Sequence, residues 1–203
     1  NLLGRFATLN QSDFAGLDAS NNVVAGATLS GLGSVTYSPN PNTAAALPNI
    51  SGTLDVVDVV NSNTAATTAF RLGSSSVTFS RGVRFNTAHA TGLNWSVDTA
   101  GRTFSAGNGL GILVGPNVNT DVSFGGSGSI RTTVSSGAQD LYLTNHSSKN
   151  LTINCTISNV GGRSWRLIKS GSGKVIFGGN TDTLSSLWVE TGTVQIGNGG
   201  ATG

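Results

Sequence analysis

Short stretches in which hydrophobic and polar residues alternate make up most of the chain after residue 70. In one of them, Leu141 and Leu143 flank the more polar Tyr142. Because successive side chains of a β-strand point to opposite faces, this period of two predicts strands with one buried face. The spacing of an amphipathic helix does not occur in these stretches, so the pattern predicts an all-β chain.

Turn-forming residues separate the stretches about every 8 to 12 residues, which is the spacing typical of a β-sandwich, a barrel or a solenoid. Alternation alone does not distinguish a sandwich from a parallel β-helix, because both bury every second residue. Glycines at the corners are expected to adopt positive φ, which glycine does without steric strain. These glycines are Gly171, Gly173, Gly178, Gly179, Gly192 and Gly197.

The first 70 residues are less regular than the rest. Three prolines between positions 38 and 49 predict a loop there, because proline lacks the backbone donor that a strand needs. The strand-like stretches around this loop would either extend the same stack or cover its end, as the terminal units of solenoids do. We therefore divide the chain into an N-terminal cap or irregular first coils, residues 1–70, and a stack of coils, residues 71–203.

Thirteen residues between positions 167 and 200 fit one repeat pattern: Leu167, Lys169, Gly171, Gly173, Val175, Phe177, Gly179, Asn180, Val189, Gly192, Thr193, Val194 and Ile196. On these residues the segment 167–200 closely resembles the autotransporter-associated β-strand repeat. The resemblance implies a right-handed parallel β-helix in an exported, passenger-type protein of a bacterial cell surface. Residues 182–186 depart from the family pattern, which leaves the register of that corner open. Because the repeat ends near the end of the chain, we expect the array to continue in a longer parent chain.

Composition argues against several classes of partner and cofactor. The net charge is only +2, and its basic residues are dispersed, so a nucleic-acid surface is not expected. No apolar run approaches the ~20 residues that cross a bilayer, so no membrane span is expected. A phosphate-binding loop ending at Lys174 is rejected, because Ile168 and Val175 stand where that motif needs glycine and a hydroxyl. We expect no cofactor.

Residues that carry hydrolytic chemistry are scarce. Glu190 is the single glutamate, and among the aspartates Asp121 with either Asp140 or Asp98 remains a candidate cross-coil pair for a polysaccharide lyase or hydrolase. His89 and His146 occur without a nucleophile elbow and are expected to be solvated. We therefore predict no catalytic residues and treat the chain as a non-enzyme, with the polysaccharide enzyme as the alternative.

Metal binding and thiol chemistry are not expected either. The calcium motif of β-rolls is approached at residues 125–130, but Ile130 replaces its ligand aspartate. The single cysteine, Cys155, excludes an internal disulfide. Alternation within residues 151–157 predicts one strand whose buried face includes Cys155, which makes it a core residue with a raised thiol pKa.

Two aromatic residues are candidates for a contact surface. Trp188 and Tyr142 point opposite to their aliphatic neighbours, so both are expected on the outside. There Trp188 would either bind a partner or pack under a loop or against the next coil. With the resemblance, this favours a non-catalytic, secreted structural or adhesive module, such as a stalk, filament or coat component. Its expected partners are copies of itself, the rest of a longer parent chain, or surface glycans. A carbohydrate-binding adhesin that uses Trp188 and Tyr142 is a further alternative.

Overall fold

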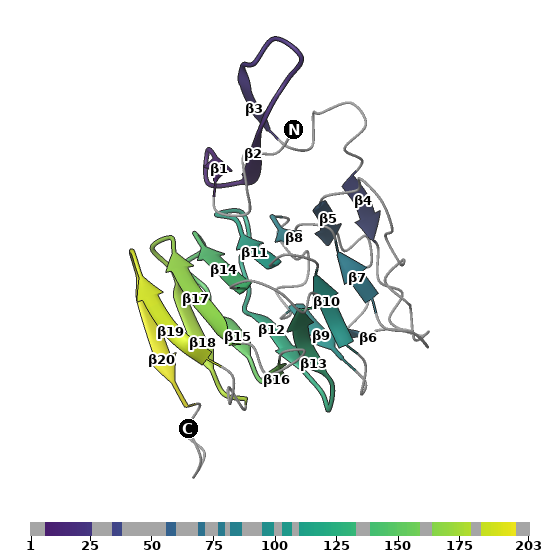
Figure 1. Cartoon of the computed structure of the whole chain (residues 1–203), viewed down its shortest axis with the longest axis vertical. Coiled ribbons are helices and arrows are strands. Elements are labelled where there is room, and N and C mark those ends of the chain that lie inside the picture. The colour runs from purple at the N-terminus through teal and green to yellow at the C-terminus, as the bar shows by residue number, and fades with distance from the viewer. Residues whose placement is uncertain are drawn as a thin grey trace.

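The chain folds into stacked β-strands. The computed structural model describes residues 7–25, 34–37, 56–59, 69–71, 77–79, 82–86, 95–99, 103–106, 110–132, 139–158, 164–179 and 184–197. Within these ranges every regular element is a strand and no helix occurs, so the predicted all-β class is confirmed. Three sheets are parallel and one small sheet is antiparallel (Figure 1). The loop predicted at residues 38–49 and His89 lie outside the described residues.

The parallel sheets have seven, six and four strands among the described residues. The seven-stranded sheet contains β4 (Ser34–Tyr37), β5 (Val56–Val59), β8 (Gly82–Phe85), β11 (Leu110–Val114), β14 (Gln139–Asn145), β17 (Trp165–Ser170) and β19 (Leu184–Val189). The six-stranded sheet contains β6 (Ala69–Arg71), β9 (Trp95–Asp98), β12 (Val122–Gly125), β15 (Leu151–Ile153), β18 (Lys174–Phe177) and β20 (Thr193–Ile196). The four-stranded sheet contains β7 (Val77–Phe79), β10 (Thr103–Ala106), β13 (Ser129–Thr132) and β16 (Thr156–Ser158).

Consecutive strands enter the three sheets in turn. From β8 to β16, every third strand returns to the same sheet and pairs in parallel with the strand three places before it. After β16, β17 and β19 extend the seven-stranded sheet, and β18 and β20 extend the six-stranded sheet. Equivalent positions of successive strands therefore form columns of side chains that run across each sheet.

The core is built from these columns. On the seven-stranded sheet Ile112 lies between Val83 and Leu143, and on the six-stranded sheet Ile153 lies between Phe124 and Phe177. Residues of all three sheets join in one buried cluster, whose side chains are almost completely removed from water. Burial of this aliphatic and aromatic surface is the main force that holds the strands together.

A β-bulge sets the register of the corner that the sequence left open. The pairing of β17 with β19 shifts between Trp165 and Arg166, so that Leu184 and Ser185 together oppose Trp165. The hydroxyl of Ser185 donates a 2.9 Å hydrogen bond to the carbonyl oxygen of Trp165. This extra residue restores the alternation, because Leu187 then faces Leu167 and continues its column.

The corner glycines follow the prediction only in part. Gly171, Gly192 and Gly197 have positive φ as predicted, but the prediction is wrong for the other three, Gly173, Gly178 and Gly179. Glycine is required at position 173 for lack of space instead, because a Cβ atom would collide with the carbonyl oxygen of Ser147. A Cβ atom at Gly179 would likewise collide with the carbonyl oxygen of Cys155.

The predicted single strand at residues 151–157 is wrong, because it is divided into β15 and β16. The chain bends at Asn154 and Cys155, whose backbone N–H groups both donate to the carbonyl oxygen of Phe124, at 2.7 and 3.2 Å. The bend carries the chain from the six-stranded to the four-stranded sheet. Cys155 is nevertheless a buried core residue, as predicted, and burial raises the pKa of its thiol to about 11.

A small antiparallel sheet lies beside the parallel ones. It contains β1 (Thr8–Leu9), β2 (Asp13–Leu17) and β3 (Val23–Ala25). Phe14 packs against Leu113 of β11, and Asp13 forms an ion pair with Arg84 of β8 at 2.6 Å. Both contacts are made with residues that alternate with the core positions of the seven-stranded sheet, so the small sheet covers part of its outer face (Figure 1). The division at residue 70 stays a prediction.

Candidate functional site

The outer face of the last strands of the seven-stranded sheet carries a row of three large side chains. Tyr142 pairs with Ile168, and Ile168 pairs with Trp188. Trp188 is 60% exposed, whereas Tyr142 and Ile168 are half-buried. Neighbouring strands lie ~4.8 Å apart, so Tyr142 and Trp188 stand roughly 10 Å from each other on the same face.

An ion pair borders this row. Nε of Arg166 lies 2.6 Å from Oδ1 of Asp140, and its second guanidinium nitrogen donates to Oδ2 at 2.8 Å. The hydroxyl of Tyr142 donates to the same carboxylate at 3.1 Å, which fixes the tyrosine ring. The hydrogen bonds from Arg166 to Asp140 raise the pKa of the guanidinium. Asp140 is therefore a structural acceptor in this face.

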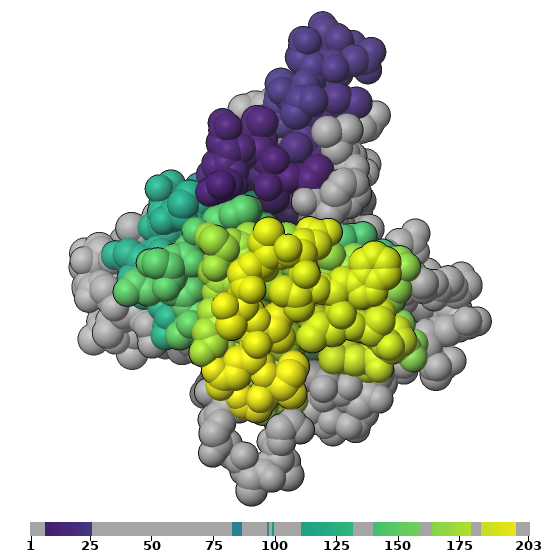
Figure 2. Space-filling model, turned by 90° about the vertical axis from the view of Figure 1, so that its left-hand side faces the viewer, coloured from purple at the N-terminus to yellow at the C-terminus, as the bar shows by residue number. Residues whose placement is uncertain are grey.

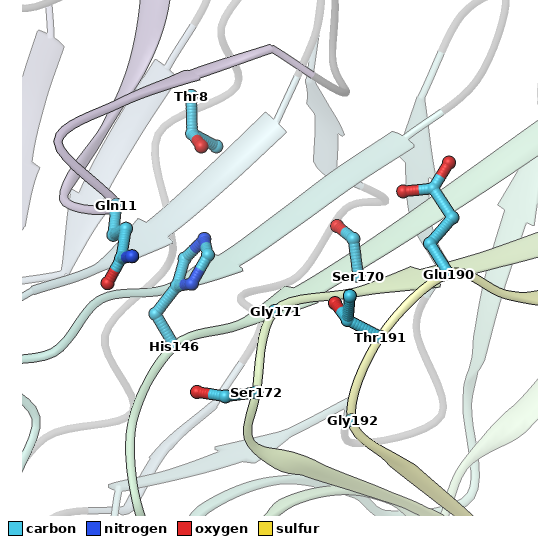
Figure 3. A pocket seen from close by; sticks show the side chains of 9 residues that line it. All are labelled: Thr8, Gln11, His146, Ser170, Gly171, Ser172, Glu190, Thr191 and Gly192. Atoms are coloured by element: carbon cyan, nitrogen blue, oxygen red, sulfur yellow. The ribbon is translucent and has the colours of Figure 1, made fainter.

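A pocket opens at the carboxyl ends of β14, β17 and β19. It has a volume of about 590 Å³, within the range of small-molecule sites. Its lining comes from the β1–β2 region and from three successive turns of the stacked strands (Figure 3). The residues that line it are Thr8, Gln11, His146, Ser170, Gly171, Ser172, Glu190, Thr191 and Gly192.

His146 has an unpaired nitrogen at this pocket. Its ring projects from the turn after β14 toward the space between Gln11 and Gly171 (Figure 3). Its Nε2 atom is buried and has no hydrogen-bond partner among the described residues. Burial, and secondarily the charge of Lys169, lowers the pKa of His146, so the imidazole is neutral at pH 7. The prediction that His146 is solvated is therefore wrong for this nitrogen.

A buried lysine holds the turns beneath the pocket. Lys169 is 1% exposed, and it occupies the column that contains Leu143. Its Nζ atom donates to the carbonyl oxygens of Ser170 at 2.7 Å, Gly171 at 2.6 Å and Thr191 at 3.0 Å. Burial lowers the pKa of this ammonium group to about 8. Because Gly171 and Thr191 both line the pocket, Lys169 fixes its shape from inside the core.

An asparagine has the same role in the preceding turn of the stack. Asn145 is fully buried, and its Nδ2 atom donates to the carbonyl oxygens of Lys149 at 2.8 Å and Lys174 at 2.9 Å. Its Oδ1 atom accepts a 3.0 Å bond from the N–H of Ser147. Asn145 and Lys169 thus each join the turn that follows their own strand to the next turn of the stack.

Acidic and metal-ligating side chains are few among the described residues of the site. Among the described residues that line the pocket, Glu190 is the single carboxylate, whereas glycoside hydrolysis by two carboxylates needs a pair. The candidate Asp121 accepts a 2.8 Å hydrogen bond from the N–H of Asn150, 29 residues later in the next turn of the stack, which is a structural role. The described part of the chain holds no group of three or more metal-ligating His, Cys, Asp or Glu residues.

Sequence reasoning found the two aromatic residues but not the pocket. Trp188 and Tyr142 lie on one face and in one row, which alternation on separate strands did not reveal. Thr8 and Gln11 come from a sheet that the sequence did not predict. Lys169 and Gly171 stand at matching positions of the repeat that residues 167–200 resemble, and this match was the sequence signal at this corner.

Comparisons with protein-family models, curated proteins and solved structures found no match for this chain. A search of the described residues for a helix long and apolar enough to cross a bilayer found none.

Proposed function

We propose that this chain is a non-catalytic, self-associating structural and adhesive module of a secreted bacterial cell-surface protein. In this proposal its strands wind as a right-handed parallel β-helix of the autotransporter-associated repeat type. Two observations support the winding: consecutive strands visit three parallel sheets in turn, and the repeat-like segment supplies the last four strands. A coil of this kind cannot bury its own core and needs neighbours on both sides.

The observation that carries the proposal is the uncovered last layer. Leu187, Val189 and Ile196 continue buried columns of the core, yet they are 39%, 48% and 58% exposed. Within the described residues, β19 pairs only with β17, and β20 only with β18. Figure 2 shows these last strands open to the viewer across one end of the stack.

An uncovered layer of this kind favours the addition of a further layer of strands. Its aliphatic side chains favour burial, and the unpaired backbone groups of β19 and β20 favour a further parallel strand beside each. The partner is a second copy of this chain or a further coil of a longer parent chain. In either case the layer works as a joint through which coils are added, as a stalk, filament or coat requires.

Sedimentation velocity over a range of protein concentrations tests the joint. The wild-type chain is expected to associate, and a Val189→Lys, Ile196→Lys variant to remain monomeric, because two charges would be buried in the joint. The matched control is Val23→Lys, since Val23 is similarly exposed but lies on β3, away from this layer. Association that is equal in all three proteins, or absent in the wild type, contradicts a self-associating joint.

The non-catalytic character of the module has its own test. The purified chain is incubated with neutral and acidic polysaccharides, and reducing ends and unsaturated products are measured. No turnover is expected, because Glu190 is the single carboxylate among the described residues of the pocket lining. Turnover that is lost in Glu190→Gln would instead support a polysaccharide enzyme.

A further inference from the structure

The side chains of the pocket lining both donate and accept hydrogen bonds. Thr8, Ser172 and Thr191 supply hydroxyl groups, and Gln11 supplies an amide. A saccharide hydroxyl also both donates and accepts, so each of these side chains can form a hydrogen bond with a sugar hydroxyl as donor or as acceptor. No apolar side chain stands among the described residues of the lining. The pocket is therefore suited to a ligand covered with hydroxyl groups.

The charges at the pocket favour a neutral ligand. Glu190 contributes a carboxylate, and no Arg or Lys side chain stands among the described lining residues. The ammonium group of Lys169 lies beneath the pocket, but its hydrogen bonds go to three backbone carbonyl oxygens. An acidic sugar would therefore face Glu190 without a cation free to pair with it, which is unfavourable.

The exposed indole beside the pocket completes the site. Trp188 lies in β19, and Glu190 stands two residues later, just after the strand ends at Val189. The N–H of Glu190 still donates a 2.9 Å hydrogen bond to the carbonyl oxygen of Lys169 in β17, so the pairing reaches this residue and the Cα atoms of Trp188 and Glu190 are roughly 7 Å apart. Ile168 and Tyr142 continue the row of Trp188 across the sheet, alongside the pocket, since Ser170 of the pocket lining follows Ile168 by two residues. The C–H face of a sugar ring is apolar and flat, so it packs well on an exposed indole while the hydroxyl groups at its edge reach polar neighbours.

The unpaired Nε2 atom of His146 is an independent observation at the same place. A buried nitrogen without a partner costs free energy, unless a water molecule or a ligand hydroxyl supplies the missing hydrogen bond. The neutral imidazole can accept a hydrogen bond or donate one, depending on its tautomer. Its ring borders the pocket beside Gln11, where a ligand would lie (Figure 3).

From these observations we infer that the pocket and Trp188 together bind a neutral saccharide. Hydroxyl groups of one sugar unit are held by the pocket lining, and the next unit is stacked on the indole. This inference rests on the adhesive role in the proposed function and gives it a ligand class and a site. It does not depend on self-association, because the outer face and the uncovered core columns are different surfaces.

Titration calorimetry with cellobiose, N,N′-diacetylchitobiose and digalacturonate tests the inference, at a concentration where the chain sediments as one species. At least one neutral disaccharide is expected to bind saturably, and digalacturonate more weakly. Trp188→Ala and Ser172→Ala should each weaken binding by about fivefold, the equivalent of losing one stacking or hydrogen-bond contact. Both residues are exposed, so neither change threatens the fold.

Two further variants sharpen the result. Val23→Ala, an exposed position on β3, should leave binding unchanged. Glu190→Gln should reduce the discrimination against digalacturonate, because the repelling charge is gone. The inference is overturned by absence of saturable binding to either neutral disaccharide, by equal affinity in Trp188→Ala and wild type, or by tighter binding of an extended peptide at the same residues. Self-association would stand after any of these outcomes.

Discussion

The ammonium group of Lys169 donates a 3.0 Å hydrogen bond to the carbonyl oxygen of Thr191, in the next turn of the stack. The lysine thereby joins two successive turns from inside a column of aliphatic side chains. A buried cation of this kind is stabilised by its carbonyl partners and destabilised by loss of its hydration. The balance between these effects depends on pH and can be measured.

We expect the free energy of unfolding to rise with pH between about 8 and 10.5. The pKa of Lys169 is lowered to about 8 in the folded chain, from 10.5 without burial. In this window the unfolded chain binds more protons than the folded chain, so raising the pH favours folding, by about 3 kcal/mol across the window. Urea unfolding followed by tryptophan fluorescence at several pH values measures the slope.

Two variants test whether Lys169 causes the dependence of the free energy of unfolding on pH. Lys169→Met keeps the length of the side chain and removes the titrating group, so its stability should lack this rise. Lys149→Met alters an exposed lysine and should keep the wild-type slope. If Lys169→Met and the wild type have the same slope across the window, the buried ammonium group is not its source.

Asn145 should be among the most sensitive polar residues of the stack. Asn145→Ala removes two hydrogen bonds to carbonyl oxygens and one from the N–H of Ser147, and it leaves these backbone groups buried. At about 1–3 kcal/mol for each unsatisfied group, unfolding should become easier by several kcal/mol. Asn154→Ala, at an exposed position, is the control and should change stability by less than about 0.5 kcal/mol. Equal effects would show that Asn145 does not hold the turns.

The buried faces of the strands could be predicted from the sequence because apolar and polar residues alternate strictly. Leu141 and Leu143 were assigned to a buried face from spacing alone, and both are buried. The assignment worked because a strand in a stack of this kind has one side that faces the core and one that does not. Two corners were predicted less well, because the chain can turn there without leaving the alternating pattern.

The bend at Cys155 is the clearest example. Leu151, Ile153, Cys155 and Ile157 alternate without interruption, yet the chain changes sheets between Ile153 and Ile157. Alternation reports which side faces inward, but it does not report a bend between two walls of the same core. The pocket was hidden for a related reason: it forms where three turns meet a sheet from the start of the chain.

Cys155 should resist thiol reagents in the folded chain. It is buried in the core, and burial raises the pKa of its thiol to about 11, so thiolate is scarce at neutral pH. Reaction with 5,5′-dithiobis(2-nitrobenzoate) at pH 8 is expected to follow the rate of unfolding and to become rapid in urea. Rapid labelling of the native chain would contradict the burial of this bend.

Gly173 and Gly125 differ in the space around them and so test how closely the turns are packed. A Cβ atom at Gly173 would collide with the carbonyl oxygen of Ser147 and would lie 2.6 Å from Cγ of Asn145, so Gly173→Ala must push adjacent turns apart. At Gly125 an added Cβ atom would have no neighbour within 4 Å, and this residue lacks positive φ. Gly173→Ala should therefore destabilise the chain by about 2–4 kcal/mol, as other severe core disruptions do.

Gly125→Ala should instead be neutral or stabilise the chain by up to about 1 kcal/mol, because alanine restricts the unfolded chain without meeting an obstacle. Chemical unfolding of both variants, with wild type in parallel, gives the comparison. Since Gly173 contacts the turns that Asn145 and Ser147 form, its alanine variant should also perturb the amide resonances of the pocket lining. Similar stabilities for the two variants would mean that the turns do not stack as closely as the structure places them.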